Sequence, residues 1–243
     1  MLFRKVRRRF HKLKQLYTDQ QINEQQVLLS LDLDENLQVL RSIYQDCFDV
    51  VFRTFLIGGQ TKAVLIYIEG LSNIEEIDEN VLAPLTSETE ERVRSLREML
   101  KKKIHISKMK EVKTFADCIE NISIGNPVLF VQHEASGLAL GLAKWEKRSI
   151  EEPTAESVVR GPREGFVETL GVSTSLLRRK IKSPHLKMKS MKIGSYTNTD
   201  VVIAYIEGLA DHTLIEEVEN RLQRIEIDSV LESGYIEELI EDN

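Results

Sequence analysis

The sequence predicts an α/β (α+β) fold of two related subdomains, each a mixed sheet with flanking helices, joined by a charged linker. At 243 residues, the chain is long enough for two small domains, since a typical domain has about 100 to 200 residues. The segment AVLIYIEGL at residues 63–71 returns as VVIAYIEGL at residues 201–209, 138 positions later. Around both copies, strand-like and helix-like segments alternate.

The repeat suggests three parts. We expect a basic N-terminal arm and helix over residues 1–33, a first α/β subdomain over 34–150 and a second over 151–243. Fewer elements follow the second copy of the repeat than the first. Either the second subdomain is smaller, or the chain is a piece of a longer protein.

The first subdomain should open with helices and a hairpin. Apolar spacing over residues 20–45 predicts two short helices, with Asp32 or Asp34 as a cap between them. Residues 50–59 are rich in β-branched and aromatic side chains and stop at a glycine pair, and residues 60–71 supply a second strand. This pattern predicts an antiparallel hairpin with a short turn.

Two helices are predicted next. The first follows Leu71 and closes near Pro84. The second runs from Thr86 or Ser87 to Lys103, because acidic residues gather at its start and lysines at its end, which suits the helix dipole.

The first subdomain should end with one more helix and two strands. Residues 115–122 have helical spacing, and residues 128–132 form a short apolar run typical of a buried strand. A turn around Gly137 then leads into a strand over residues 138–144.

The second subdomain should replay the hairpin and its trailing helix. A helix over residues 164–181 ends before Pro184, and residues 186–209 repeat the hairpin, with a turn two residues longer than in the first copy. Residues 212–227 and 228–243 read as helices.

The repeated YIEGL segment carries an acid and a glycine in both copies. Gly70 and Gly208 should permit the turn after each strand. Because both copies keep the acid, Glu69 and Glu207 are expected to fix the turn or cap the next helix, and not to act in catalysis.

Charge is distributed unevenly along the chain. Residues 1–16 carry +7, whereas the whole chain carries −6, which leaves −13 for the rest. This acidic bulk argues against a nucleic-acid partner. The arm combines an apolar helical stripe with basic residues, which favours contact with an anionic membrane surface; the alternative is a frayed, solvated terminus. The residues expected at the membrane surface are Arg4, Lys5, Arg7, Arg8 and Arg9.

No catalytic constellation is visible in the sequence. The five histidines are scattered, the segment IGGQTK lacks phosphate-loop spacing, and SLDLDEN is only half a calcium loop. We therefore expect no enzyme activity, no cofactor and no metal site. Cys47 and Cys118 match no metal or redox spacing and should be structural thiols in a reducing compartment. No run of residues is long and apolar enough for a secretory signal or a membrane span.

The most distinctive segment lies between the two halves, at residues 145–168. Its arginines can pair with carboxylates through a planar fork, which favours contacts between subdomains or with a partner. The alternative is a solvated linker whose ion pairs contribute about 0 to 1 kcal/mol each. The sole tryptophan lines a cleft in one interpretation and packs in a core in the other. We call this segment the charged joint, and its candidate contact residues are Trp145, Glu151, Glu152, Glu156, Arg160, Arg163, Glu164 and Glu168.

The segments EEPTAESVVRGPREGF, LLRRKI, TDVVIAYIEGLAD and VLESGYIEELIEDN resemble the A-subunit family of spore germination proteins, the GerA family. The resemblance covers residue 34 to the end and departs at Ser173, near which an asparagine is usual. It implies the soluble N-terminal part of a subunit that continues into membrane helices in the spore inner membrane, with this part on the cytoplasmic side. Implied partners are a B subunit, a C lipoprotein and further copies of the A subunit, in a complex that couples nutrients to ion release.

Two functions remain open from the sequence. One is a coupling and assembly domain whose two subdomains shift under contacts made by the charged joint. The other is a module that binds a small-molecule germinant in a cleft between the subdomains.

Overall fold

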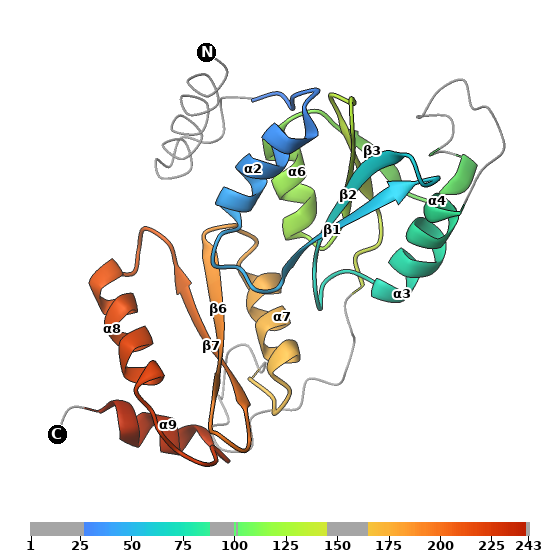
Figure 1. The fold of residues 1–243 in the computed structure, drawn as a ribbon. Helices are drawn as coiled ribbons and strands as arrows, with labels where there is room; N and C mark the ends of the chain where they lie inside the picture. The colour runs from blue at the N-terminus through green and yellow to red at the C-terminus, as the bar shows by residue number, and fades with distance from the viewer. Residues whose placement is uncertain (1–26, 88–99, 101, 145–164, 242–243) are drawn as a thin grey trace, which may run out of the picture. The chain divides into compact units, whose positions relative to one another are not determined.

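The computed structural model describes residues 27–87, 100, 102–144 and 165–241 (Figure 1). Their contacts divide the chain into two compact units: unit 1 contains Met1–Tyr44 and Asp49–Pro184, and unit 2 contains Gln45–Phe48 and His185–Asn243. The predicted boundary at residue 150 lies outside the described residues and stays a prediction. The helix that was expected to open the second subdomain belongs, by its contacts, to unit 1.

The predicted α/β fold is confirmed, and its larger part is an antiparallel sheet in unit 1. The strand order is β1-β2-β4-β5-β3. Both β2 and β4 are almost wholly buried, because helices cover the sheet on both faces: α2 and α6 on one, α3 and α4 on the other (Figure 1). The strands are β1 (Val50–Ile57), β2 (Thr61–Ile68), β3 (Met109–Val112), β4 (Val128–Val131) and β5 (Gly137–Leu140).

Two helices of unit 1 begin at side chains that cap them. The Asp32 carboxylate accepts a hydrogen bond from the Asp34 N–H at 2.9 Å, and the Thr114 hydroxyl accepts one from the Asp117 N–H at 3.1 Å. These caps start α2 (Leu33–Ile43) and α6 (Phe115–Ser123). After β2 the chain forms one helical stretch from α3 (Ile74–Ile77) through a π-helical turn (Asp78–Leu82) to α4 (Ala83–Thr86).

Three predictions for unit 1 need comment. The helix expected up to Lys103 falls mainly on residues outside the described part. The last strand ends at Leu140, not at residue 144. Strand β3 was missed, because its two adjacent charged residues, Lys110 and Glu111, lie in a lysine-rich stretch that resembles a solvated loop. The strand forms an edge of the sheet, where one face meets water.

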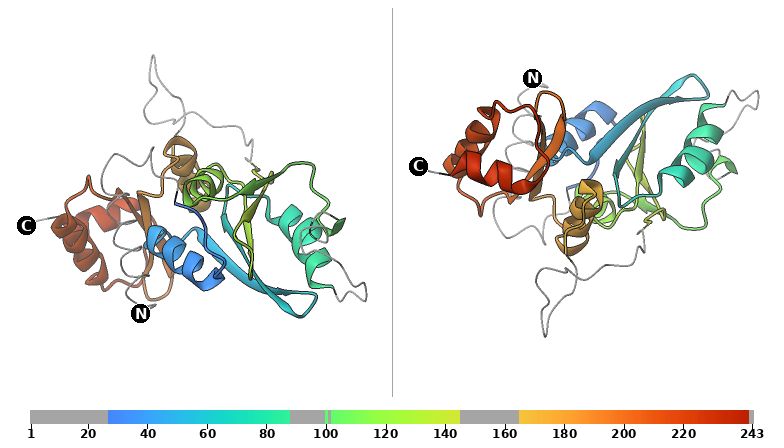
Figure 2. Two further views of the ribbon diagram at one scale, coloured as in Figure 1. Left: turned by 90° about the horizontal axis from the view of Figure 1, so that it is seen from above. Right: turned by 90° about the horizontal axis from the view of Figure 1, so that it is seen from below.

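Unit 2 is a hairpin with helices on one face. Strand β6 (Leu186–Ile193) pairs with β7 (Thr199–Ile206), and α8 (His212–Gln223) and α9 (Ser233–Ile240) follow (Figure 2). Its core is small and joins Ile193 on the hairpin to Leu222 and Val230. Helix α8 ends at Gln223, shorter than expected, and its Asp211 cap accepts a hydrogen bond from the Thr213 N–H at 2.8 Å.

The two hairpins repeat each other closely in sequence position. Each second strand has eight residues, and a helix begins at Ile74 after the first hairpin and at His212 after the second, which preserves the 138-residue offset. The longer second turn, residues 194–198 against 58–60, is confirmed. The hydrogen bonds Glu69 N–H to Asp49 O (2.9 Å) and Glu207 N–H to His185 O (2.8 Å) close both hairpins alike.

The surroundings of the two copies differ. Strand β2 is paired on both sides, by β1 and β4, whereas β7 pairs only with β6 among the described strands. The leucine after the shared glycine is buried in the first copy and exposed in the second: Leu71 is 1% exposed and Leu209 is 82% exposed. The turn after α6 covers Leu71, since a Cβ on Gly125 would lie 2.7 Å from the Leu71 carbonyl oxygen.

None of the described helices has both the length and the hydropathy needed to cross a bilayer.

The unequal burial of the two leucines predicts unequal effects of one substitution at equivalent positions. Leu71→Ala should lower the free energy of unfolding by about 2–5 kcal/mol, because it leaves a cavity under the turn after α6. Leu209→Ala should change it by less than about 0.5 kcal/mol in dilute solution. Urea unfolding monitored by circular dichroism, with hydrogen exchange to locate the loss, checks both values. Equal costs at the two positions would contradict the assigned burial.

Candidate functional site

Most residues of the charged joint lie outside the described part of the chain. This holds for Trp145 and for all the expected contact residues up to Glu164, as it does for the basic residues of the arm. Glu168 alone is described: it is exposed and lies just before α7 (Leu170–Lys180). The structure therefore shows the end of the charged joint, where the chain enters α7.

A serine holds that end against the helix. The Ser173 hydroxyl accepts a hydrogen bond from the Val167 N–H at 3.2 Å and lies 3.1 Å from the Val167 carbonyl oxygen, to which it donates. A hydroxyl can do both because it is a donor and an acceptor at once. Ser173 marks the departure from the family pattern noted above, and its side chain links the end of the joint to α7.

The far end of α7 carries a buried ion pair. Arg178 Nε lies 2.7 Å from Asp49 Oδ2, and Arg178 Nη2 lies 2.7 Å from Asp49 Oδ1. The two side chains are 3% and 5% exposed. This bidentate geometry is the strongest that an arginine and a carboxylate can adopt. Asp49 directly precedes β1, so the pair joins α7 to the open end of the first hairpin.

The same end of the hairpin contacts α7 through the repeated glycine. Gly70 has φ +79°, and a Cβ built on it would lie 2.1 Å from Ser175 Oγ. No heavy atom lies within 4 Å of the equivalent Cβ at Gly208. We call the four residues Asp49, Gly70, Ser175 and Arg178 the α7 dock. In the first copy, YIEGL therefore also provides a seat for this helix.

The end of the second hairpin has a different ion pair. Glu207 Oε2 lies 3.3 Å from Lys187 Nζ, and the Lys187 side chain is buried. Burial lowers the pKa of the nearby His185; the Glu207 carboxylate opposes this shift and the Lys187 charge adds to it. The expectation that both repeated acids fix the turn is wrong. Glu207 pairs with a lysine, the Glu69 carboxylate has no hydrogen bond or ion pair among the described residues, and backbone groups close both hairpins.

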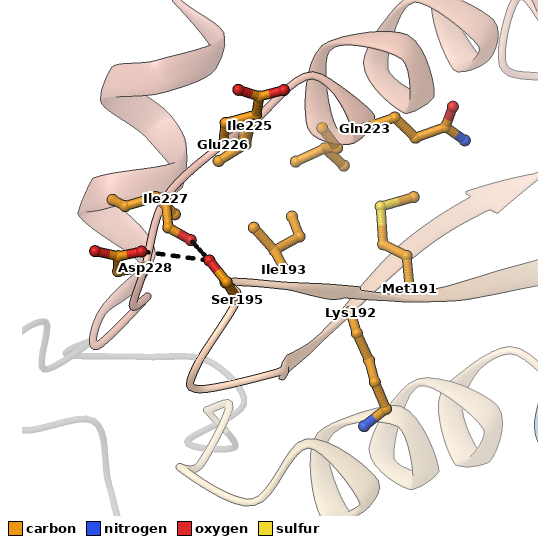
Figure 3. Close-up of a pocket in the computed structure, with 11 residues that line it drawn as sticks. Met191, Lys192, Ile193, Ser195, Gln223, Ile225, Glu226, Ile227 and Asp228 are labelled. Atoms are coloured by element: carbon orange, nitrogen blue, oxygen red, sulfur yellow. Dashed lines mark hydrogen bonds between the residues drawn. The ribbon is translucent and has the colours of Figure 1, made fainter.

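An open pocket lies in unit 2 between β6 and the segment after α8 (Figure 3). Its volume is about 850 Å³, within the range of small-molecule sites. Met191 and Ile193 point into it, while Lys192 points to the other side of the strand (Figure 3). Ser195 Oγ donates a hydrogen bond to the Ile227 carbonyl at 3.2 Å, and the other polar side chains of the lining include Gln223 and Glu226.

Sequence reasoning missed both members of the buried ion pair. Arg178 stands among three consecutive basic residues, and nothing in that run distinguishes it. Asp49 carried a usable signal, because it is the one charge in the otherwise uncharged stretch CFDVVF. An acid in a segment that enters a buried strand needs a partner.

The buried pair predicts a large cost for removing either partner. Asp49→Ala or Arg178→Ala should lower the free energy of unfolding by about 3–5 kcal/mol, because the remaining charge stays buried without compensation. The double change Asp49→Leu with Arg178→Met should recover most of this loss. Urea unfolding in a double-mutant cycle measures the coupling.

An exposed pair provides the matched control. Arg53 and Asp78 lie 3.2 Å apart with about half of each side chain exposed, so Arg53→Ala should cost about 0–1 kcal/mol. An Arg178→Ala variant no less stable than Arg53→Ala would show that the buried pair does not hold α7.

The glycines of the repeat predict a second contrast. Gly70→Ala and Gly208→Ala should each cost about 1–2 kcal/mol, because both residues have left-handed backbones. Gly70→Ala should cost more, since its new methyl group collides with Ser175. Adding Ser175→Ala should remove this excess, as measured by thermal unfolding. Equal costs without that addition would contradict the close approach of α7.

Comparison with known proteins identifies the family. A family model described as Bacillus/Clostridium GerA spore germination protein matches residues 38–243. The uncharacterized membrane protein YfkQ of Bacillus subtilis (strain 168) is 42% identical over 88% of this chain and 42% of its own length. Spore germination protein KA of the same strain is 38% identical over 92% of this chain and 42% of its own length. The chain thus spans less than half of these relatives.

A solved structure agrees with the sequence comparisons. The crystal structure of the N-terminal domain of the A subunit of the Bacillus megaterium spore germinant receptor GerK3 superposes with a TM-score of 0.68 at 29% identity, covering 90% of this chain and 81% of that one. The fold, the family model and the relatives lead to one conclusion: the chain belongs to the GerA family of spore germination proteins, and its fold is similar to that of the N-terminal domain of the GerK3 A subunit.

Proposed function

We propose that this chain is a non-enzymatic coupling and assembly domain, which passes a signal from nutrient sensing towards ion release. The observation that carries the proposal is the buried Arg178–Asp49 pair. The pair attaches α7, the helix that follows the charged joint, to unit 1. Asp49 is the first residue of unit 1 after the chain leaves the unit 2 segment Gln45–Phe48. The chain after α7 enters unit 2 again between Pro184 and His185.

The connectivity makes α7 suitable as a relay. A force that a partner applies to the charged joint reaches α7 through the Val167–Ser173 hydrogen bonds. The docked helix is held by the buried ion pair, by the close approach of Gly70 to Ser175 and by its buried face, which includes Leu176. An undocked state, in which both charges return to water, is the second state of the proposed relay. A partner that binds one state better shifts the balance between them.

Partners and location follow the family. We propose contacts with the B and C subunits and with further A subunits, on the cytoplasmic face of the spore inner membrane. Candidate contact residues are those of the charged joint, and the basic residues of the arm would meet anionic lipid. Charge supports the second assignment, since residues 1–16 carry +7 in a chain of net charge −6.

The test separates signalling from folding. Arg160→Glu and Arg163→Glu in the receptor should abolish nutrient-triggered germination or assembly with the B and C subunits, while the purified chain keeps its circular dichroism spectrum and melting temperature. Arg224→Glu makes the same charge change at an exposed position at the end of α8 and should germinate normally. Normal germination in both joint variants would refute the coupling role.

A small-molecule module is the alternative, and the pocket of about 850 Å³ in unit 2 is the observation that favours it. A thermal-shift and calorimetric screen with amino acids, sugars and nucleosides distinguishes the two. Saturable binding that Gln223→Trp, at an exposed position of the pocket lining, abolishes would favour the sensor.

A further inference from the structure

We propose that the free edge of β7 is an interface at which two copies of this chain pair, β7 against β7, into one antiparallel four-stranded sheet. The inference names a partner surface for the assembly role proposed above and rests on that role. The observations that carry it are the hydrogen-bonding pattern of the second hairpin, the comparison with the first hairpin, the charges on the strand edges and two exposed apolar side chains.

The hydrogen-bonding pattern shows which groups face outward on β7. The Glu207 N–H bonds to the His185 carbonyl, and bonded pairs alternate along an antiparallel ladder. Odd-numbered residues of β7 therefore bond to β6, while Asp200, Val202 and Ala204 point their N–H and C=O groups to the other side. The opposite edge follows the same rule, since Met188 of β6 bonds outward to Asp46 and Phe48. Within the described chain, no strand pairs with the outward groups of β7.

The repeat shows what such an edge accommodates. Residues 63–66 of β2 correspond to residues 201–204 of β7, and they pair antiparallel with β4, an uncharged apolar strand. In the first copy, this edge of β2 is therefore inside the sheet, where β4 pairs with it. In the second copy the same edge is left open.

The edge of β7 also lacks the charged residues that keep the other edge strands from pairing with another chain. Strand β1 carries an arginine, β3 carries a lysine and a glutamate, and β6 carries three lysines. Strand β7 has no lysine, no proline and no bulge in its register. Its one charge, Asp200, is matched within the hairpin by Lys192 at 2.9 Å.

A second copy fits this edge better than an unrelated strand, because the outward groups are symmetric. Asp200, Val202 and Ala204 are centred on Val202, and the carbonyl of Ile206 is already taken by the N–H groups of Leu209 and Ala210. A two-fold axis at Val202 pairs Val202 with itself and Asp200 with Ala204 of the partner copy. The outward N–H and C=O groups of these three residues are then all used.

The same axis brings together the two most exposed large apolar side chains of the described chain. Leu209 follows β7 and Tyr196 lies in the turn before it, and each is 82% exposed. Antiparallel pairing about Val202 places the end of β7 in one copy beside the hairpin turn of the other. The partner thus supplies for Leu209 the cover that the turn after α6 supplies for Leu71.

The experiment uses the 243-residue chain, with sedimentation velocity over a wide concentration range. Wild type should show a monomer–dimer equilibrium. Ala204→Glu, at an exposed position, puts a second acid opposite Asp200 of the partner and should weaken association about tenfold. Ala204→Lys is the matched control, which puts a lysine opposite that aspartate and should retain the dimer. Circular dichroism verifies that both variants fold.

Cysteine cross-linking tests the register. Residues paired across the axis have Cα atoms about 5.5 Å apart, within the span of a disulfide. Val202→Cys should form a covalent dimer under mild oxidation, whereas the more exposed Ala204→Cys should not. The native thiols interfere little, because Cys47 and Cys118 are buried and burial raises the pKa of the Cys118 thiol.

Several results would overturn the proposal: a strictly monomeric wild type, a dimer that Ala204→Glu leaves unchanged, or a covalent dimer of Ala204→Cys alone. Linkage of the Val202→Cys variant to a different subunit in the intact receptor would assign the edge to a foreign strand. The β7 interface is tested by self-association of the isolated chain, in the absence of other subunits. The coupling role is tested by germination with the charged-joint variants, which leave β7 unchanged. Failure of one proposal is therefore distinguishable from failure of the other.

Discussion

The buried carboxylate of Asp49 is the constraint on which the arrangement of unit 1 depends. A charge in that position cannot stay unpaired, since an isolated buried ion loses its hydration without replacement. Its only adequate partner among the described residues is a guanidinium that reaches both carboxylate oxygens, and Arg178 provides it from α7. The helix is thereby assigned to unit 1, although the chain enters it from the charged joint and leaves it towards unit 2.

The duplicated hairpin shows how one local design serves two purposes. Both copies keep the left-handed glycine and the backbone hydrogen bond that closes the hairpin. The first copy is enclosed by β4, α6 and α7, and its apolar side chains form a core. Within unit 2, the described helices α8 and α9 cover one face of the second copy, and part of its apolar surface remains accessible. Sequence similarity between repeats therefore does not imply similar stability or similar exposure.

Local physics explains why so much of the fold could be predicted. The hairpins, the cap at Asp32 and the short buried strand at residues 128–131 depend on neighbours within a few residues. Strand β3 could not be recognised, because its pairing with β5 is decided by residues about 30 positions away. The candidate site was predicted least well. The two acids of YIEGL were expected to share one role, but Glu207 pairs with a lysine and Glu69 pairs with none among the described residues. Arg178 and Asp49, which form the buried pair, lie 129 residues apart in the sequence.

The sequence by itself determined the fold class, the repeat and the family resemblance, because periodicity, turn residues and characteristic segments are written in consecutive positions. Only the tertiary structure decided which arginine meets the buried aspartate, which copy of YIEGL supports a helix, and which strand edge is left open. Those outcomes depend on contacts between distant segments, and their free energies come from desolvation and packing, which a linear pattern does not specify.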